Sequence, residues 1–254
     1  ANNGDVPDRQ IAENELVGVH VQGISGEDTN YGYTNVSIKA SGNGEFSNYS
    51  TIMYYPQSGK NVIISAYHPF NNSALDSYEF VVEQNQNQDN YYFSSDLLWS
   101  EKKEYTRGKE EKNLSFVHKL SKITYGLHSG AGQPDVSGAT VEILNVETVT
   151  RFNRETGNIT QEGITSNKKN VRVGEKYGAI IIPQTINKGD KLLKVTLKSG
   201  GILYYTVDEP AWGITFESGY VYHYDITVNL TELKVKTSII DWTPISISGN
   251  AYME

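Results

Sequence analysis

Residues 220–230 read Tyr-Val-Tyr-His-Tyr-Asp-Ile-Thr-Val-Asn-Leu, and this stretch decides the fold class. Large apolar side chains occupy every second position, namely Tyr220, Tyr222, Tyr224, Ile226, Val228 and Leu230. Most of the intervening positions are polar. Because successive side chains of a β-strand point to opposite faces of a sheet, this alternation predicts a half-buried strand.

The same two-residue period recurs in shorter stretches upstream. They are Val17/Val19/Val21, Val36/Ile38/Ala40, Val62/Ile64/Ala66 and Tyr78/Phe80/Val82. Strands of this kind follow one another about every 8–15 residues, and no amphipathic helix longer than two turns separates them. The pattern predicts an all-β protein built of antiparallel β-sandwiches rather than of βαβ units.

The stretch from residue 114 to 127 changes its parity in the middle. Leu114, Phe116, His118 and Leu120 share one face, whereas Ile123 begins a run of opposite parity. A β-bulge near Ser121 is the predicted cause of the switch. His118 lies on the apolar face, so it is interpreted as a buried, hydrogen-bonded structural histidine.

Two polar segments suggest how the chain divides. Residues 1–15 are polar and aperiodic and are predicted to be a flexible leader. Residues 101–113 are rich in charges of both signs, with Tyr105 as their only large apolar residue. We therefore expect two consecutive β-sandwich domains, at residues 16–110 and 111–254.

Composition limits the classes of partner and compartment. The 254 residues carry 22 basic and 30 acidic side chains, a formal charge of -8, which disfavours nucleic acid and anionic membranes as partners. There is no cysteine, and the longest apolar run, Ala179–Ile182, is far below the ~20 residues of a membrane-spanning helix. The chain starts at Ala1 without Met, which suits either a processed secreted protein or a chain trimmed after its signal.

The sequence carries none of the common motifs for catalysis or cofactor binding. The sequence contains no Gly-x-Ser-x-Gly, no Gly-x-Gly-x-x-Gly and no Walker pattern. The five histidines show no close metal-site spacing, and no ordered calcium-loop motif occurs. We therefore predict no catalytic residue, cofactor or metal ligand. A glycoside hydrolase stays the less favoured alternative, because two carboxylates can be brought together by any fold.

Three tryptophans leave a binding function open. Trp99, Trp212 and Trp242 could form an aromatic platform on which sugar rings stack. Core packing is the preferred role for at least two of them. A glycan-binding surface lipoprotein is thus the main alternative function.

Several segments together resemble the fimbrillin-like surface proteins of Bacteroides-type bacteria. These are residues 63–70 (Ile-Ile-Ser-Ala-Tyr-His-Pro-Phe), 96–99 (Asp-Leu-Leu-Trp), 114–123 (Leu-Ser-Phe-Val-His-Lys-Leu-Ser-Lys-Ile), 224–229 (Tyr-Asp-Ile-Thr-Val-Asn) and 241–242 (Asp-Trp). They follow the order of the family from about residue 60 to the C-terminus. The resemblance implies two transthyretin-like β-sandwich domains and export to the outer membrane as a lipid-anchored precursor.

The resemblance also implies assembly into pili or adhesive fibres. The expected partners are other pilin subunits joined by β-strand addition, with surface glycans or proteins of host or bacterium as further candidates. In related pilins a protease cuts after an arginine and frees an N-terminal strand. Arg9 is the candidate processing site, although it precedes the first predicted strand at Leu16 rather than following it.

The C-terminal tail is the second candidate for strand exchange. Ile245 and Ile247 alternate with serines in residues 245–249, as a donor strand requires. A plain last strand of the same chain fits the pattern equally well. The sequence therefore predicts a fimbrial subunit or adhesin that works through its strand edges and not through chemistry.

Overall fold

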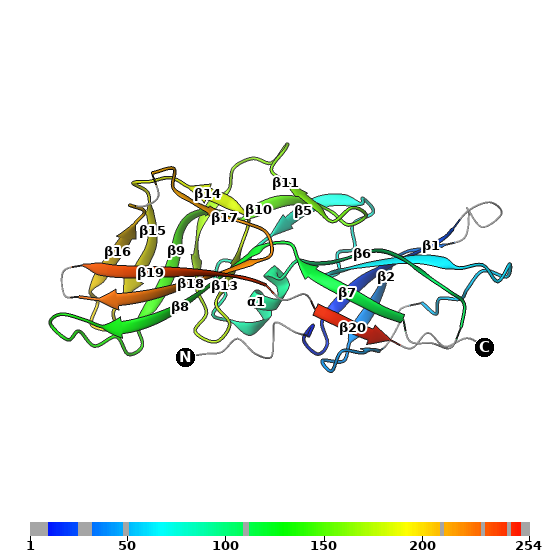
Figure 1. The fold of residues 1–254 in the computed structure, drawn as a ribbon, viewed down its shortest axis with the longest axis horizontal. Coiled ribbons are helices and arrows are strands. Elements are labelled where there is room, and N and C mark those ends of the chain that lie inside the picture. Colours follow the sequence, from blue (N-terminus) through cyan, green and yellow to red (C-terminus); the bar gives the residue numbers. More distant parts are fainter. Residues whose placement is uncertain are drawn as a thin grey trace.

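The computed structural model describes residues 10–24, 32–47, 51–108, 112–208, 211–229, 232–242 and 245–249, with side chains up to residue 242. The molecule is elongated, and its regular secondary structure is almost entirely β-strand, as Figure 1 shows. Within the described residues a single α-helix occurs, α1 (Asp89–Ser95). The all-β fold class is therefore confirmed.

A seven-stranded sheet forms one end of the molecule. Its order is β20-β7-β6-β4-β1-β2-β3. The strands are β1 (Leu16–Gly23), β2 (Gly32–Ala40), β3 (Phe46–Ser47), β4 (Val62–His68), β6 (Leu98–Tyr105), β7 (Lys112–His118) and β20 (Ile245–Gly249). Val17, Val19 and Val21 are all buried, so the two-residue period placed them on the correct face.

The part of the chain that packs on this sheet begins before the first strand. Ile11, inside the segment predicted to be a leader, is only 4% exposed and belongs to the same core cluster as Val17. The backbone N–H of Asn14 donates to Ala40, and Ala40 donates back to Glu15. Residues 11–15 thus pack against the sheet, while residues 1–9 lie outside the described part.

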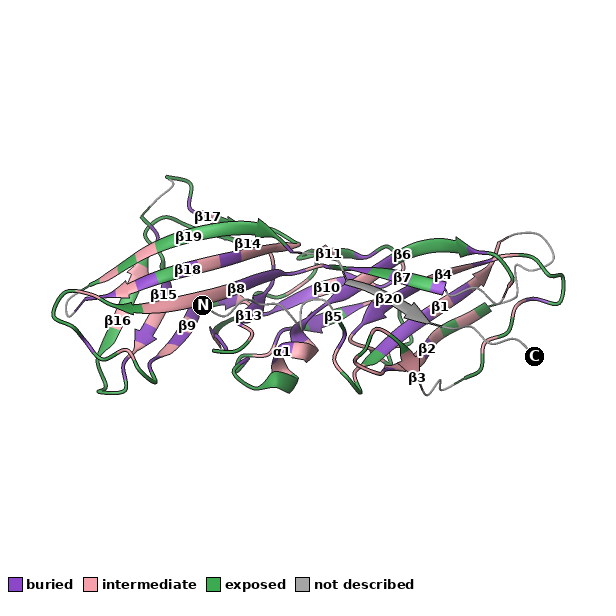
Figure 2. Ribbon diagram, turned by 60° about the horizontal axis from the view of Figure 1, so that its bottom comes forward, coloured by how far each residue is buried: buried purple, intermediate pink, exposed green. Residues whose placement is uncertain are grey.

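The mixed-charge stretch forms a strand rather than a simple linker. Residues 101–104 are exposed on β6 and Tyr105 is buried at its end. Figure 2 shows this green, exposed end of β6. Strand pairing continues into it, because residues 103–105 of β6 pair with β4, while Leu98 and Trp99 of β6 pair with β7. β7 continues this sheet to His118, and the domain division at residue 110 remains a prediction.

The parity switch near Ser121 has a different cause from the predicted bulge. β7 ends at His118, and β8 (Ser121–Ser129) begins in another sheet. The two runs of apolar residues therefore face different cores, and residues 119 and 120 carry the chain between them. The bulge at Ser121 was wrong, because periodicity reports the face of a strand and not its sheet.

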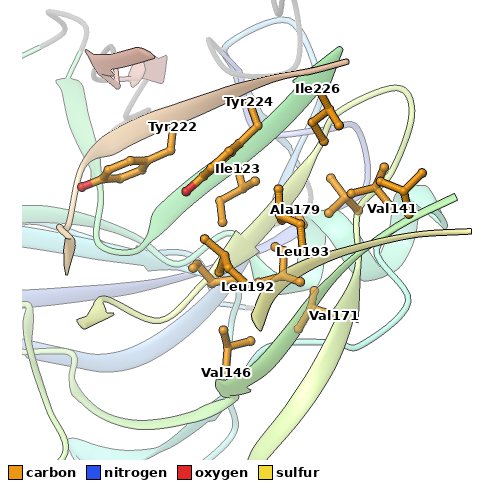
Figure 3. Packing of buried hydrophobic residues seen from close by; sticks show 14 of the residues in the cluster. Ile123, Val141, Val146, Val171, Ala179, Leu192, Leu193, Tyr222, Tyr224 and Ile226 are labelled. Atoms are coloured by element: carbon orange, nitrogen blue, oxygen red, sulfur yellow. The ribbon is translucent and has the colours of Figure 1, made fainter. Parts of the chain in front are cut away.

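The opposite end of the molecule contains two four-stranded sheets, ordered β13-β8-β18-β19 and β12-β9-β15-β16. Their remaining strands are β9 (Thr140–Glu147), β12 (Lys168–Arg172), β13 (Ala179–Ile181), β15 (Lys191–Thr196), β16 (Ile202–Thr206), β18 (Tyr220–Val228) and β19 (Leu233–Asp241). Residues from both sheets fill the core between them, as Figure 3 shows for Tyr224, Ile226, Val141 and Leu193.

β18 is the strand predicted from residues 220–230, and its apolar positions from Tyr222 to Val228 are buried. It pairs antiparallel with β19 but parallel with β8, with Tyr224 opposite Tyr125. The described strands pair mostly antiparallel, as expected, and this pair is parallel. A parallel neighbour needs a long crossover, and the chain between residues 130 and 219 supplies it by building the second sheet.

The middle of the molecule joins the two ends. It holds a three-stranded sheet, β11-β10-β5, a two-stranded sheet of β14 and β17, and α1. The strands are β5 (Ser77–Val81), β10 (Val149–Asn153), β11 (Asn158–Thr160), β14 (Gln184–Ile186) and β17 (Ile214–Phe216). Here Tyr67, Tyr78 and Phe152 pack with ring centroids 5.8–6.3 Å apart. Strands distant in sequence thus share one aromatic core.

Candidate strand-pairing site

The predicted donor tail forms strand β20 and pairs antiparallel with β7. Ile245 lies opposite Phe116 and Ile247 opposite Leu114. The structure thus brings both candidate tail residues to β7, although their side chains are not described. Arg9, the candidate processing site, lies outside the described residues.

β7 presents two different faces. Leu114 and Phe116 are 6% and 0% exposed and belong to the core cluster under β1 and β2. Ser115 and Val117 point outward and are exposed. Because β7 pairs with β6 through only two residue pairs, the tail supplies most of the backbone pairing that the described chain offers to β7.

The pairing of the tail with β7 forms one edge of the seven-stranded sheet. A strand without a neighbour presents unpaired N–H and C=O groups, which another extended segment can bind. In this structure, β20 from the C-terminal part of the chain pairs with β7. Any other extended segment with the same alternation of side chains would satisfy the same groups.

β19 is a second sheet edge. Among the described residues it pairs only with β18, and Figure 2 shows it largely exposed. Ile239 and Ile240 are 56% and 64% exposed near its C-terminal end. Ile239 lies opposite the buried Tyr222, so its parity directs it toward the sandwich interior, yet it stays open to solvent. The molecule therefore has an apolar edge as well as a covered one.

His118 stands at the end of β7 next to the root of the tail. It is 3% exposed, and its Nδ1 lies 2.8 Å from Asp96 Oδ1, so the prediction of a buried, hydrogen-bonded histidine is confirmed. Its imidazole stacks on the indole of Trp242. The sequence carried no signal for this stack, because the two residues are far apart in the chain.

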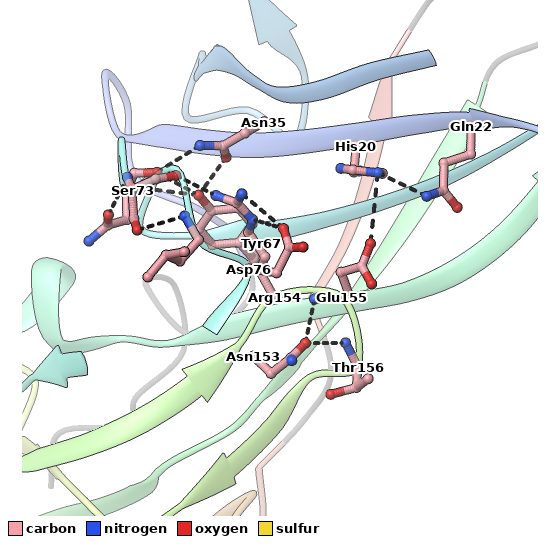
Figure 4. A network of polar contacts seen from close by, with 12 residues as sticks. His20, Gln22, Asn35, Tyr67, Ser73, Asp76, Asn153, Arg154, Glu155 and Thr156 are labelled. Atoms are coloured by element: carbon pink, nitrogen blue, oxygen red, sulfur yellow. Dashed lines mark hydrogen bonds and ion pairs between the residues drawn. The ribbon is translucent and has the colours of Figure 1, made fainter. Parts of the chain in front are cut away.

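Arg154 ties the β10–β11 hairpin to the loop before β5. It is 5% exposed, and its Nε and Nη2 lie 3.0 and 2.9 Å from Asp76 Oδ1. Its Nη1 donates to the carbonyl of Ser73, as Figure 4 shows. Trp99 Nε1 on β6 donates to the carbonyl of Arg154. The hairpin is thus bound to the seven-stranded sheet on one side and to β5 on the other.

His20 faces the same hairpin from β1, with its Nε2 4.0 Å from Glu155 Oε1. Burial disfavours the imidazolium and lowers the pKa of His20 below 6.5, although Glu155 raises it in part. Between the lowered pKa of His20 in the folded chain and its ordinary value of 6.5, the unfolded chain binds more protons than the folded one. The stability contribution of His20 is therefore present above pH 6.5 and lost as the pH falls.

We accordingly expect His20→Gln to reduce the acid sensitivity of the fold. Thermal unfolding followed at pH 7.5 and 5.5 should show a smaller drop in Tm for His20→Gln than for the unsubstituted chain. The effect is modest, because the imidazole is only partly buried and solvent screens its charge. Equal drops in the two proteins would contradict the assignment.

The three tryptophans have different environments. Trp242 is buried, and Trp99 is partly buried against the same aromatic cluster. Trp212, between β16 and β17, is 77% exposed. Core packing by two of them is confirmed, and only Trp212 offers its indole to a ligand.

The region around His20 also contains a small cavity of about 10 Å³, lined in part by Asn35, Tyr67 and Arg154. That volume corresponds to about one water molecule and admits no sugar ring. In the parts of the chain with described side chains, no group of three or more His, Asp or Glu could hold a metal ion. No described helix is long and apolar enough to cross a membrane.

Known proteins show the same architecture. A model of the fimbrillin-like family matches residues 5–242. A protein named for cell adhesion from Bacteroides uniformis is 20% identical, with a TM-score of 0.71 over 93% of each chain. Another from Bacteroides ovatus is 16% identical, with a TM-score of 0.69 over 91% of this chain and 88% of its own.

A more distant structure shares the fold as well. A tip fimbrial protein from Porphyromonas gingivalis with a C-terminal truncation is 14% identical, with a TM-score of 0.52 over 95% of this chain and 97% of its own. No curated protein sequence matches the chain. At these identities the structural likeness establishes the fold, and the match to the family model extends over nearly the whole chain.

Proposed function

The chain belongs to the fimbrillin-like family, and from this membership we propose that it is a structural subunit or adhesin of bacterial cell-surface fimbriae. Its fold is shared by proteins named for cell adhesion and by a tip fimbrial protein. A role in assembly accounts for a molecule whose distinctive features are strand edges. The proposal includes a lipid-anchored precursor at the outer membrane and no enzymatic activity.

The proposal extends to how subunits join, and one observation carries it: the tail strand β20 lies on β7. β20 follows every other described strand, and among the described strands it pairs with β7 alone. An identical element exchanged between copies keeps every contact it had within one copy. We infer that Ile245 and Ile247 act in donor-strand pairing with β7 of a neighbouring subunit.

A disulfide that locks the tail tests this function. Ser246 lies opposite Ser115, and directly opposed residues of antiparallel strands have Cα atoms about 4.5–5.5 Å apart, within the range of a disulfide. The chain has no cysteine, so the double variant Ser115→Cys/Ser246→Cys forms one defined bond. The oxidised variant should remain monomeric, whereas the reduced variant should assemble.

Size-exclusion chromatography and electron microscopy of both forms give the readout. The matched control is Ser137→Cys/Ser246→Cys, in which the exposed Ser137 lies in the loop between β8 and β9. It should assemble equally under both conditions. Assembly of the oxidised Ser115→Cys/Ser246→Cys protein to the same extent as its reduced form would rule out the tail as the joining strand.

Glycan binding remains the second candidate function, and it is supported by Trp212 alone. An indole that is 77% exposed can stack on the apolar face of a sugar. Trp99 and Trp242 cannot share in such a platform, because both pack in the aromatic core. A role as an adhesin and a role in glycan binding are compatible in one subunit.

A further inference from the structure

Trp242, the last described residue before the tail strand β20, is held by a buried aromatic stack. Trp242 is 5% exposed, and its ring lies 3.5 Å from that of His118, centroid to centroid, with the planes 6° apart. The backbone N–H of Trp242 donates to the carbonyl of Gly219 at 2.7 Å. Trp242 therefore holds the chain at the end of β7, immediately before the tail begins.

The stack lies in a charged and aromatic setting. His118 Nδ1 bonds Asp96, which fixes the plane of the imidazole. On the indole lies the ammonium of Lys122, 5.6 Å from the ring centroid, and Lys122 itself is 2% exposed. A cation over the face of a tryptophan is attracted by its π-electrons, most strongly where water is excluded. His118 and Lys122 thus contact Trp242 directly, and Asp96 holds His118 in place.

The stack is also one that can be released. His118 Nε2 and Trp242 Nε1 are both buried without a hydrogen-bond partner within the described protein. Buried polar groups of this kind cost free energy, which release of Trp242 to solvent would recover. The gain from burying the indole is therefore partly offset, and the contact is weaker than its buried area suggests.

The short distance along the chain between Trp242 and the tail couples this contact to the position of the tail. Only Thr243 and Pro244 separate Trp242 from Ile245. At about 3.3–3.6 Å per residue, Ile245 stays within ~11 Å of Trp242. A stacked Trp242 thus keeps the start of the tail close to its own β7, where Ile245 lies opposite Phe116. This closeness favours pairing within the chain over pairing with a second molecule.

We propose that the His118–Trp242 stack is a latch that favours pairing of the tail with its own β7 and slows its donation to a second subunit. Its biological role rests on the proposed strand exchange, since it names the contact that regulates that exchange. The latch itself is a property of the single chain. It can therefore be measured without any assembly.

Hydrogen exchange of the full chain measures the latch. Trp242→Leu removes the stack but keeps an apolar side chain, and Trp212→Leu is the matched control at an exposed site. We expect the amides of residues 245–249 to exchange about tenfold faster in Trp242→Leu. This factor corresponds to the stabilisation that is typically lost when an aromatic pair is removed. Trp212→Leu should leave them unchanged. His118→Leu, which removes the other ring, should reproduce the effect if Trp242→Leu folds poorly.

A second readout separates the latch from the strand exchange. A fluorescent peptide of residues 243–254 is added to each protein, and its capture is followed by polarisation. Faster amide exchange together with faster capture supports both proposals. Faster amide exchange without any capture supports the latch and rejects donor-strand pairing. Equal protection of the tail in Trp242→Leu and Trp212→Leu, in chains that are folded, overturns the latch whatever the peptide does.

Discussion

Gly178→Ala is expected to lower the free energy of unfolding by about 3 kcal/mol or more, from backbone strain and overpacking combined. Gly178 has φ = +90°, a conformation that L side chains rarely adopt. A Cβ there would lie 2.2 Å from the carbonyl oxygen of Ile123 in β8. Because the obstacle is backbone in a central strand, no side-chain rotation relieves it.

Gly200→Ala is the matched control, because it separates the two causes. Gly200 has φ = +92°, but a Cβ there meets nothing within 4 Å. Its loss should be about 1–2 kcal/mol, the cost of the left-handed conformation alone. Urea unfolding followed by tyrosine and tryptophan fluorescence gives both values. Equal losses in the two variants would mean that β13 does not approach β8 as described.

The substitution also bears on the functional region. Gly178 immediately precedes β13, whose Ala179 pairs with Ile123, and this strand covers one edge of β8. The adjoining Ile180 belongs to the aromatic cluster that buries Trp242. Gly178→Ala is therefore expected to loosen the packing around Trp242 as well. Faster hydrogen exchange of the tail amides should accompany the loss of stability.

Local patterns in the sequence were sufficient for the strands and their faces. Tyr222, Tyr224 and Ile226 are buried because a two-residue period leaves a strand little choice of which side meets the core. The same reasoning placed Leu114 and Phe116 inward on β7. Periodicity is a property of a single strand, so it needs no knowledge of the rest of the chain.

Which strand pairs with which could not be predicted in the same way. The periodicity of residues 114–127 predicted one bulged strand, but these residues contribute to two sheets. The parallel pairing of β8 and β18 joins segments almost a hundred residues apart. Such pairings depend on loop lengths and on the packing of whole layers, which no short window of sequence contains.

The candidate site shows the same division. Alternation of Ile245 and Ile247 predicted a strand in the tail, and the structure places that strand on β7. The stacking of Trp242 on His118, by contrast, depends on the ends of β7 and β19 meeting. A buried histidine was predicted, but its most informative neighbour was not.

Mixing two single-cysteine proteins tests most directly whether the tail of one subunit pairs with β7 of another. One protein carries Ser115→Cys and the other Ser246→Cys, so neither can form the bond within its own chain. Ser137→Cys mixed with Ser246→Cys is the control for random collision. After incubation and mild oxidation, peptide mapping identifies which chains are joined.

If the tail of one subunit pairs with β7 of another, a disulfide-linked heterodimer between position 115 of one chain and position 246 of the other should form much faster than any product of the control mixture. Opening the latch with Trp242→Leu in the donor should accelerate it further. Linkage no faster than in the control, from folded proteins and after long incubation, would contradict the account. The tail would then be only the last strand of its own sheet.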